Sequence, residues 1–144
     1  MQVNIKFLNK NAKMPTRGSD AAAGYDLYAC NTQDIIVAPH TTAKIGTGLS
    51  MSFDTNYFAG IYARSGLATK EGLRPANCVG VCDADYRGEY IVAIHNDSHI
   101  TRIITPGEKI AQVIFQKYEV ANFNTVEELD ETERGDGGFG STGK

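Results

Sequence analysis

The segment 83–88 places chemically active side chains between two apolar runs. It reads Asp-Ala-Asp-Tyr-Arg-Gly, follows the apolar residues 79–82 and precedes a second apolar run that begins at Tyr90. This pattern predicts a β-hairpin whose turn carries two acids, an aromatic ring and a guanidinium. One carboxylate, at Asp83, could act as a general base on a water molecule, and Tyr86 could present a flat wall to a sugar. Acids at a turn are usually solvated or paired with arginine, and spacing alone does not choose between these interpretations.

A second candidate lies at Arg64-Ser65-Gly66, where an apolar run ends and a helical turn is expected to begin. The N-terminus of a helix offers free N–H groups and the positive end of its dipole, so these residues together could hold a phosphate. Taken singly, Ser65 is an N-cap and Arg64 is a surface charge. As an isolated tripeptide the signal is weak.

A third candidate is the C-terminal stretch 134–143, which contains five glycines together with Arg134, Phe139 and two adjacent hydroxyl residues. Glycine lets backbone N–H groups approach phosphate oxygens, and arginine adds a fork-shaped donor. Phe139 could stack on a base. A flexible terminal linker is the plainer interpretation, but a linker needs neither the arginine nor the phenylalanine.

The elements that must position these residues are β-strands, because the hydrophobic period is two. In the first strand Val3, Ile5 and Phe7 alternate with polar residues, as a half-buried strand requires. Short strands divided by turn residues are typical of an all-β sandwich or barrel. The predicted strands cover residues 2–8, 25–29, 35–37, 43–45, 49–53, 58–63, 79–82, 90–95, 103–104 and 111–118.

One short helix is predicted before the C-terminal tail, over residues 65–70, with Ser65 as its cap and Gly72 as its stop. The composition changes after Ala121, where Asn, Glu, Asp and then Gly dominate. We therefore expect residues 1–121 to form one β-domain and residues 122–144 to form a flexible tail without a core of its own.

The composition limits the class of protein. The chain has 144 residues, of which 42% are hydrophobic and 22% charged, as expected for one globular domain. No apolar run approaches the roughly 20 residues that cross a bilayer, and the first ten residues lack a secretory signal pattern. We expect a cytoplasmic protein, or one in the host cytoplasm or nucleus if the source is a virus. The net charge of −3, without a basic block, argues against nucleic acid as a partner.

The cysteines do not suggest a metal centre. Cys30, Cys78 and Cys82 are an odd number of thiols, which argues against a disulfide framework, and we expect them to be buried. Cys78 and Cys82 could supply half of a metal site, but no second pair of ligands stands at suitable spacing.

These stretches recur, in the same order, in the homotrimeric dUTPase family. Residues 23–27 (Ala-Gly-Tyr-Asp-Leu) resemble its first motif, Arg64-Ser65-Gly66 its second and residues 80–88 its third. Residues 107–112 (Gly-Glu-Lys-Ile-Ala-Gln) look like the fourth, with Glu-Lys in place of the commoner Asp-Arg, and residues 134–143 look like the fifth. The resemblance implies a jelly-roll-like β fold, a homotrimer, and hydrolysis of dUTP to dUMP and pyrophosphate with Mg²⁺. Such an activity limits uracil incorporation into DNA and supplies dUMP for dTMP synthesis.

The resemblance also implies roles for residues in the body of the chain. Asp83 resembles the general base that activates the attacking water, and Asp26 the carboxylate that contacts Mg²⁺ through water, with no direct protein ligand to the metal. Asn77 and the backbone at Gly80 are expected to bind the uracil edge, and Tyr86 to pack on the deoxyribose. The phosphate contacts are expected from Arg64, Ser65, Gly66 and Gln112, although Gln112 could instead face solvent on its strand.

For the tail, the resemblance implies an arm that closes over the site of a neighbouring subunit. Phe139 would cover the uracil ring. Asp136 stands at a position that is often small or uncharged in the family, and its negative charge would lie near the triphosphate. The remaining contacts are expected from Arg134, Gly140, Ser141 and Thr142.

Two other functions stay open. A dCTP deaminase-like enzyme shares the expected fold, but its signature would replace the turn at Asp83 to Tyr86 with different acid and loop chemistry. A non-catalytic module that senses nucleotides or binds proteins on the same fold is less compatible with an intact Asp83 and tail.

Overall fold

The structure, a computed structural model, describes residues 1–138 and is built almost entirely from β-strands. All strand pairs in this part of the chain are antiparallel. The predicted jelly-roll-like all-β fold is confirmed. The strands are β1 (Asn4–Phe7), β2 (Thr16–Arg17), β3 (Tyr25–Tyr28), β4 (Ile35–Val37), β5 (Thr42–Gly46), β6 (Leu49–Ser52), β7 (Tyr57–Tyr62), β8 (Leu73–Pro75), β9 (Gly80–Cys82), β10 (Ile91–Asn96), β11 (Arg102–Ile104) and β12 (Lys109–Lys117).

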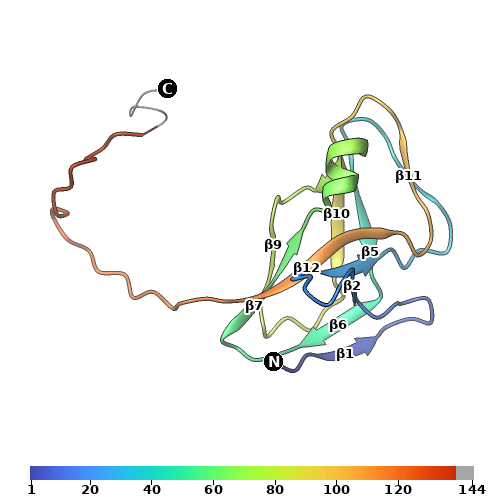
Figure 1. Ribbon diagram of the computed structural model, residues 1–144, viewed down its shortest axis with the longest axis horizontal. Coiled ribbons are helices and arrows are strands. Elements are labelled where there is room, and N and C mark those ends of the chain that lie inside the picture. The colour runs from blue at the N-terminus through green and yellow to red at the C-terminus, as the bar shows by residue number, and fades with distance from the viewer. Residues whose placement is uncertain (139–144) are drawn as a thin grey trace.

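The largest sheet has the strand order β2-β3-β12-β7-β9, and β12 crosses its middle (Figure 1). The strand β12 is hydrogen-bonded to β3 on one side and to β7 on the other. The smaller sheets are β5-β10-β8, β1-β6 and β4-β11. The apolar residues Ile110, Ala111 and Val113 of β12 are almost fully buried, because they pack into the hydrophobic core.

The core follows the alternation of the strands. On β10 the side chains of Val92 and Ile94 point inward, whereas Ile91 is exposed. The next inward residue, Asn96, is fully buried, and its amide donates to the carbonyl oxygens of Val37 (3.0 Å) and Ile100 (2.8 Å). Its polar side chain is thereby satisfied, which is the condition for a stable buried amide.

The predicted hairpin around Asp83 is wrong. The strand β9 pairs with β7 in the large sheet, whereas β10 pairs with β5 and β8 in another. The backbone of Tyr90 donates to the carbonyl of Leu49 and accepts from the N–H of Thr47. These bonds draw the chain away from β9, so residues 83–90 form a loop that joins two sheets.

The helical turn is η1 (Leu67–Glu71), a single π-helical turn. Gly72 ends it with a left-handed φ of 70°, as predicted. The predicted cap is wrong: Gly66 occupies the N-cap position without a side-chain bond, and Ser65 contributes its carbonyl, which accepts from the Thr69 hydroxyl. The strands β2 and β8 were not predicted, because β2 (Thr-Arg) has no apolar residue and β8 (Leu-Arg-Pro) ends in a proline, which argues against a strand.

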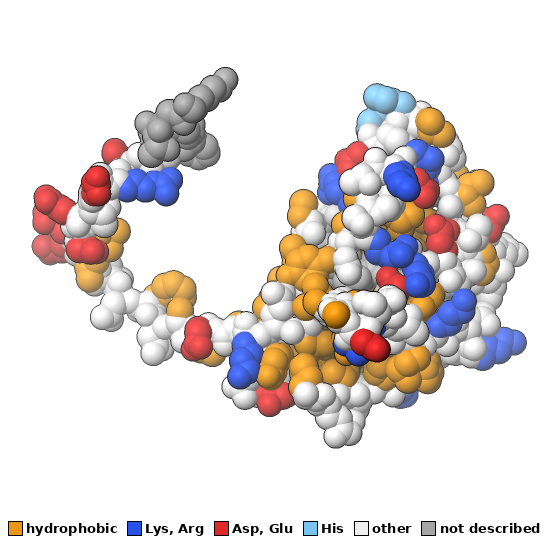
Figure 2. Space-filling view, viewed as in Figure 1, with side chains coloured by type: hydrophobic (Ala, Val, Ile, Leu, Met, Phe, Trp, Pro, Cys, Tyr) orange, Lys and Arg blue, Asp and Glu red, His pale blue; other side chains and the backbone are white. Residues whose placement is uncertain are grey.

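After β12 the chain leaves the body, and residues 118–138 form no helix or strand (Figure 1). Figure 2 shows that this segment carries a group of acidic side chains and stands apart from the body. Its large apolar residues are exposed, with Phe123 at 95%. Across residues 1–138 there is no helix of the length and hydropathy needed to span a bilayer. Cys30 is buried as expected, but Cys78 is exposed because it lies in the loop before β9.

Candidate active site

Asp26 is the centre of a cluster of charges on the large sheet. It lies on β3 with only 12% of its side chain exposed. Its Oδ1 accepts from Nε of Arg64 at 2.9 Å, and its Oδ2 contacts Nζ of Lys109 at 2.7 Å. The hydrogen bond to Asp26 raises the pKa of Lys109 above its ordinary value, so this ammonium stays charged at neutral pH. Two cations on one carboxylate leave the cluster with a net positive charge.

Gln112 lies directly opposite Asp26 on the neighbouring strand β12. Its amide nitrogen donates to the carbonyl oxygen of Ala63 at 2.9 Å, and the side chain is half-buried. A Cβ on Gly24 would overlap the amide oxygen of Gln112, so a larger residue there would push this side chain aside. The side chain therefore lines a cleft and does not simply face solvent.

The cleft beside Asp26 has a volume of about 240 Å³. Ser65 and Gly66 are exposed at its edge, and a Cβ built on Gly66 would meet no atom within 4 Å. The helix dipole adds little here because η1 is one short turn. The structure thus brings together the predicted phosphate contacts with Asp26. The lining residues are Gly18, Ala22, Gly24, Asp26, Arg64, Ser65, Gly66 and Gln112.

The loop that carries Asp83 is held by hydrogen bonds to its backbone. The Arg87 guanidinium donates to the carbonyl oxygens of Ala84 (2.7 Å) and Tyr86 (3.0 Å). The Ser50 hydroxyl donates to the carbonyl of Arg87 at 2.8 Å. The Asp83 carboxylate is exposed and forms no hydrogen bond or ion pair with any residue in 1–138. The sequence left open whether Arg87 pairs with the acids, and the guanidinium binds carbonyls instead.

A second pocket of about 190 Å³ lies under this loop. The Tyr86 hydroxyl donates to the carbonyl of Glu89 at 3.0 Å, and its ring lies 6.1 Å from the ring of Tyr90. Burial raises the pKa of the Cys82 thiol, and the charge of Asp83 adds to the rise, so the thiol stays protonated. The pocket is lined by Val81, Cys82, Asp83, Tyr86, Glu89, Tyr90 and Ile91.

Asn77 and Gly80 lie together at the start of β9. A Cβ on Gly80 would come within 3.1 Å of the Asn77 amide nitrogen and 3.2 Å of Ile61, so the backbone at Gly80 is closely packed. Between them Cys78 has a φ of 56°, which is uncommon for a residue with a side chain. The two residues expected to bind a base are therefore neighbours on a tight turn.

In the described part of the tail, Arg134 lines neither pocket. The side chain of Arg134 is exposed, and its Nε donates to the carbonyl of Gly137 at 2.8 Å within the tail itself. Phe139, Gly140, Ser141 and Thr142 lie outside the described residues. The two pockets share no lining residue, so they are separate in the part of the chain that the structure describes.

The residues of the cleft fit an indirect contact with a metal ion. Asp26 is the one acidic residue that lines it, and both of its oxygens face cations. Within residues 1–138 no group of three or more His, Cys, Asp or Glu side chains is arranged to hold a metal. Asp26 is the residue of the cleft that would lie in reach of the waters of a divalent cation.

Sequence reasoning assigned no role to Lys109. The residue stands three positions before Gln112, and on a regular strand this odd spacing would place the two side chains on opposite faces. A shift of register between Lys109 and Ala111 places an extra residue on β12. Such a bulge re-aims the side chain, which the alternation of the sequence could not reveal.

Comparison with known proteins identifies the family. A family model described as dUTPase matches residues 10–143. The deoxyuridine 5'-triphosphate nucleotidohydrolase of Corynebacterium glutamicum is 43% identical over 143 residues, which cover 99% of this chain and 95% of that protein. The solved structure of the Staphylococcus bacteriophage 80alpha dUTPase with dUPNHPP superposes with a TM-score of 0.86 at 27% identity, covering 99% of both chains. A dUTPase from phage phi11 of S. aureus, solved with a structural Mg(II) ion, has a TM-score of 0.82 at 24% identity over 91% of this chain and 100% of that one.

The match extends over nearly all of the chain and includes the residues of both pockets. The chain belongs to the dUTPase family.

Proposed function

We propose that this chain hydrolyses dUTP to dUMP and pyrophosphate, with Asp83 as the general base. The activity follows from membership of the family. The role of Asp83 is supported by one observation above all: its carboxylate is exposed on a loop held by backbone hydrogen bonds, and residues 1–138 leave it without a partner. A carboxylate of this kind keeps its lone pairs available to accept a proton.

In this mechanism Asp83 orients a water molecule and accepts its proton as the water oxygen bonds to the α-phosphorus. The bond between the α-phosphorus and the bridging oxygen breaks, and pyrophosphate leaves in line with the attack. General base catalysis requires that the protein hold a proton acceptor at hydrogen-bond distance from the water. The fixed backbone of the loop would provide that placement.

The cleft at Asp26 would bind the phosphates. Its net positive charge favours a polyanion, and the exposed Ser65 and Gly66 add hydroxyl and N–H donors. Mg²⁺, when bound, supplies charge neutralisation on the phosphate oxygens. Asp26 would contact the waters of the ion, and we assign no direct protein ligand. Arg64 and Gln112 complete the proposed phosphate contacts.

The loop pocket would select the base and sugar. The tight turn at Asn77 and the backbone at Gly80 would bind the uracil edge, and the ring of Tyr86 would pack on the deoxyribose. A site that hydrogen-bonds one donor and acceptor pattern can reject a mismatched analogue by roughly 10⁴-fold. Selective hydrolysis of dUTP would limit uracil incorporation into DNA and supply dUMP for dTMP synthesis.

The two pockets would act as half-sites that meet in a homotrimer. Residues 1–121 would form the catalytic domain, and residues 122–144 an arm that closes over a neighbouring subunit. This proposal is supported by the separation of the two pockets and by the exposed tail. A closed ring makes the exchange possible at every site. The arm would contribute Arg134, Phe139, Gly140, Ser141 and Thr142.

The decisive experiment is hydrolysis in water enriched in ¹⁸O, with dUTP, dCTP, dTTP and UTP compared. We expect turnover of dUTP alone, with the label in dUMP, because the solvent oxygen joins the α-phosphorus. Label in pyrophosphate would mean attack on the β-phosphorus and would contradict the mechanism. Ammonia release from dCTP would favour the deaminase alternative, and the absence of turnover would favour a non-catalytic module.

A further inference from the structure

The side chain of Lys109 has a place in the cleft that the proposed phosphate contacts do not explain. Its Nζ lies 2.7 Å from Oδ2 of Asp26, while Nε of Arg64 lies 2.9 Å from Oδ1 of the same carboxylate. Lys109 thus binds the second oxygen of Asp26, the carboxylate that also holds Arg64, and Arg64 is a proposed phosphate contact. Its side chain is 40% exposed, so the contact is not a requirement of core packing.

The backbone around Lys109 is shaped to make this contact. The turn before it is fixed by Glu108, whose Oε2 accepts from the N–H of Thr105 at 2.9 Å, and by Gly107, whose φ is 77°. The bulge between Lys109 and Ala111 then places Lys109 and Gln112 on the same side of the sheet, next to Asp26. Bulges commonly serve to re-aim one side chain at a functional site.

The arrangement decides what Arg64 can offer a ligand. An arginine beside a free carboxylate tends to pair with both oxygens, which uses two of its donors. Here Lys109 occupies the second oxygen, and Arg64 holds Asp26 through Nε alone, with a long 3.4 Å contact from Nη1 to the carbonyl of Lys109. Within residues 1–138 its Nη2 makes no hydrogen bond.

We propose that Lys109 is a positioning residue for phosphate binding: it holds the second oxygen of Asp26, keeps Arg64 from a two-oxygen pair and keeps the cleft positively charged. This inference rests on the proposed function. When a triphosphate draws Arg64 away from Asp26, Lys109 remains bound to the carboxylate. The buried carboxylate therefore always has a cation beside it. Loss of Lys109 should therefore weaken binding of the phosphates and leave the chemistry at Asp83 nearly unchanged.

The test compares Lys109→Met with Lys109→Arg in the full chain. Methionine keeps the aliphatic stem but loses the charge, and arginine keeps the charge. The matched control is Lys13→Met, because Nζ of Lys13 lies 5.4 Å from the Tyr28 ring that Lys109 also approaches, at 5.9 Å, yet Lys13 does not touch Asp26. Lys109→Gln serves as a second neutral variant.

We expect Lys109→Met and Lys109→Gln to bind the analogue dUpNHpp about tenfold more weakly, the lower end for loss of one charge-assisted contact. The KM for dUTP should rise in parallel with kcat changed less than about twofold, the pattern of lost uniform binding. Lys109→Arg and Lys13→Met should bind like the unaltered chain. Unaltered affinity in both neutral variants, or an equal loss in Lys13→Met, would overturn the inference while dUTP turnover by the unaltered chain stands. Absence of that turnover would overturn the proposed function and this inference together.

Discussion

The cleft at Asp26 and the loop at Asp83 hold their carboxylates in opposite ways. In the cleft both oxygens of Asp26 are paired with side-chain cations, Arg64 and Lys109. In the loop the cation nearest in sequence, Arg87, donates to backbone carbonyls, and Asp83 keeps an exposed carboxylate. The comparison teaches that a paired carboxylate is fit to orient donors, whereas an unpaired one is free to accept a proton, and these are the roles proposed for Asp26 and Asp83.

The sharpest way to break this comparison is Asp83→Asn. The amide keeps the size of the side chain but cannot accept a proton, so kcat should fall about thousandfold, within the range attributed to a general base. Binding of dUpNHpp should persist, because the phosphate cleft is untouched. Single-turnover kinetics and calorimetry separate the two effects. The matched control is Asp85→Asn, an exposed acid in the same loop, and an equal loss of turnover there would remove the special role of Asp83.

The next prediction joins the two regions across chains. Asp83→Asn chains and Arg64→Gln chains, each nearly inactive, are refolded together in equal amounts. If loop and cleft come from different members of a ring, random mixing restores about a quarter of the sites. Pyrophosphate release measures the recovery, and mass spectrometry confirms the mixing. Activity that stays at the level of the parents would mean that one chain supplies both regions.

A smaller effect is expected at the sugar wall. Tyr86→Ala should lower the ratio of kcat/KM for dUTP to that for UTP by about tenfold, because the ring would no longer exclude the 2′-hydroxyl. Tyr86→Phe keeps the ring and loses only the bond from its hydroxyl to the carbonyl of Glu89. The phenylalanine variant should keep the ratio. A ratio that the alanine variant also preserves would show that another group selects the sugar.

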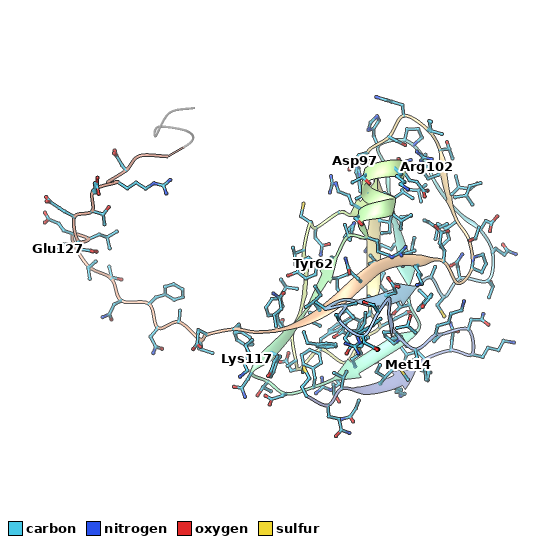
Figure 3. The ribbon with its side chains drawn as sticks, in the orientation of Figure 1. Met14, Tyr62, Asp97, Arg102, Lys117 and Glu127 are labelled. Carbon is cyan, nitrogen blue, oxygen red and sulfur yellow. The ribbon has the colours of Figure 1, made fainter. Side chains whose placement is uncertain are left out.

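The smallest effect concerns a paired carboxylate outside both regions. Asp97 lies beside η1 (Figure 3), at the end of the body where Figure 2 shows histidine side chains. The hydrogen bond from Arg74 is the main reason that the pKa of Asp97 lies below its ordinary value. Its stabilising contribution is therefore present above the unfolded pKa of about 3.9 and is lost as the pH falls through the folded value.

Asp97→Asn should consequently leave dUTP turnover unchanged. Thermal unfolding should show a small loss of stability at pH 7 that disappears in strong acid, because exposed ion pairs contribute little. Loss of turnover in this variant would show that a paired carboxylate outside the cleft also matters for activity. Ion pairing would then not set Asp26 apart from Asp97.

Local patterns in the sequence determined much of the fold. Alternation predicted most strands to within two residues at either end, including β6 and β7, because one face of each must be buried. Gly72 was readable as a stop because only a left-handed residue ends a turn in this way. The residue types at Asp83 and Arg64 also suggested a proton acceptor and a phosphate contact, and these roles stay predictions.

The tertiary structure decided which of these residues meet. Asp26, Arg64 and Gln112 come from distant parts of the chain and converge because β3, β12 and β7 are neighbours in one sheet. Ser65 was expected to be a cap, but Gly66 occupies the N-cap position of η1. The loop after Cys82 leads to another sheet, because Tyr90 bonds to the backbone near β6. Lys109 reaches Asp26 only through a bulge. Hydrogen bonds between strands that are distant in the sequence determine these contacts, and no local periodicity of the sequence encodes them.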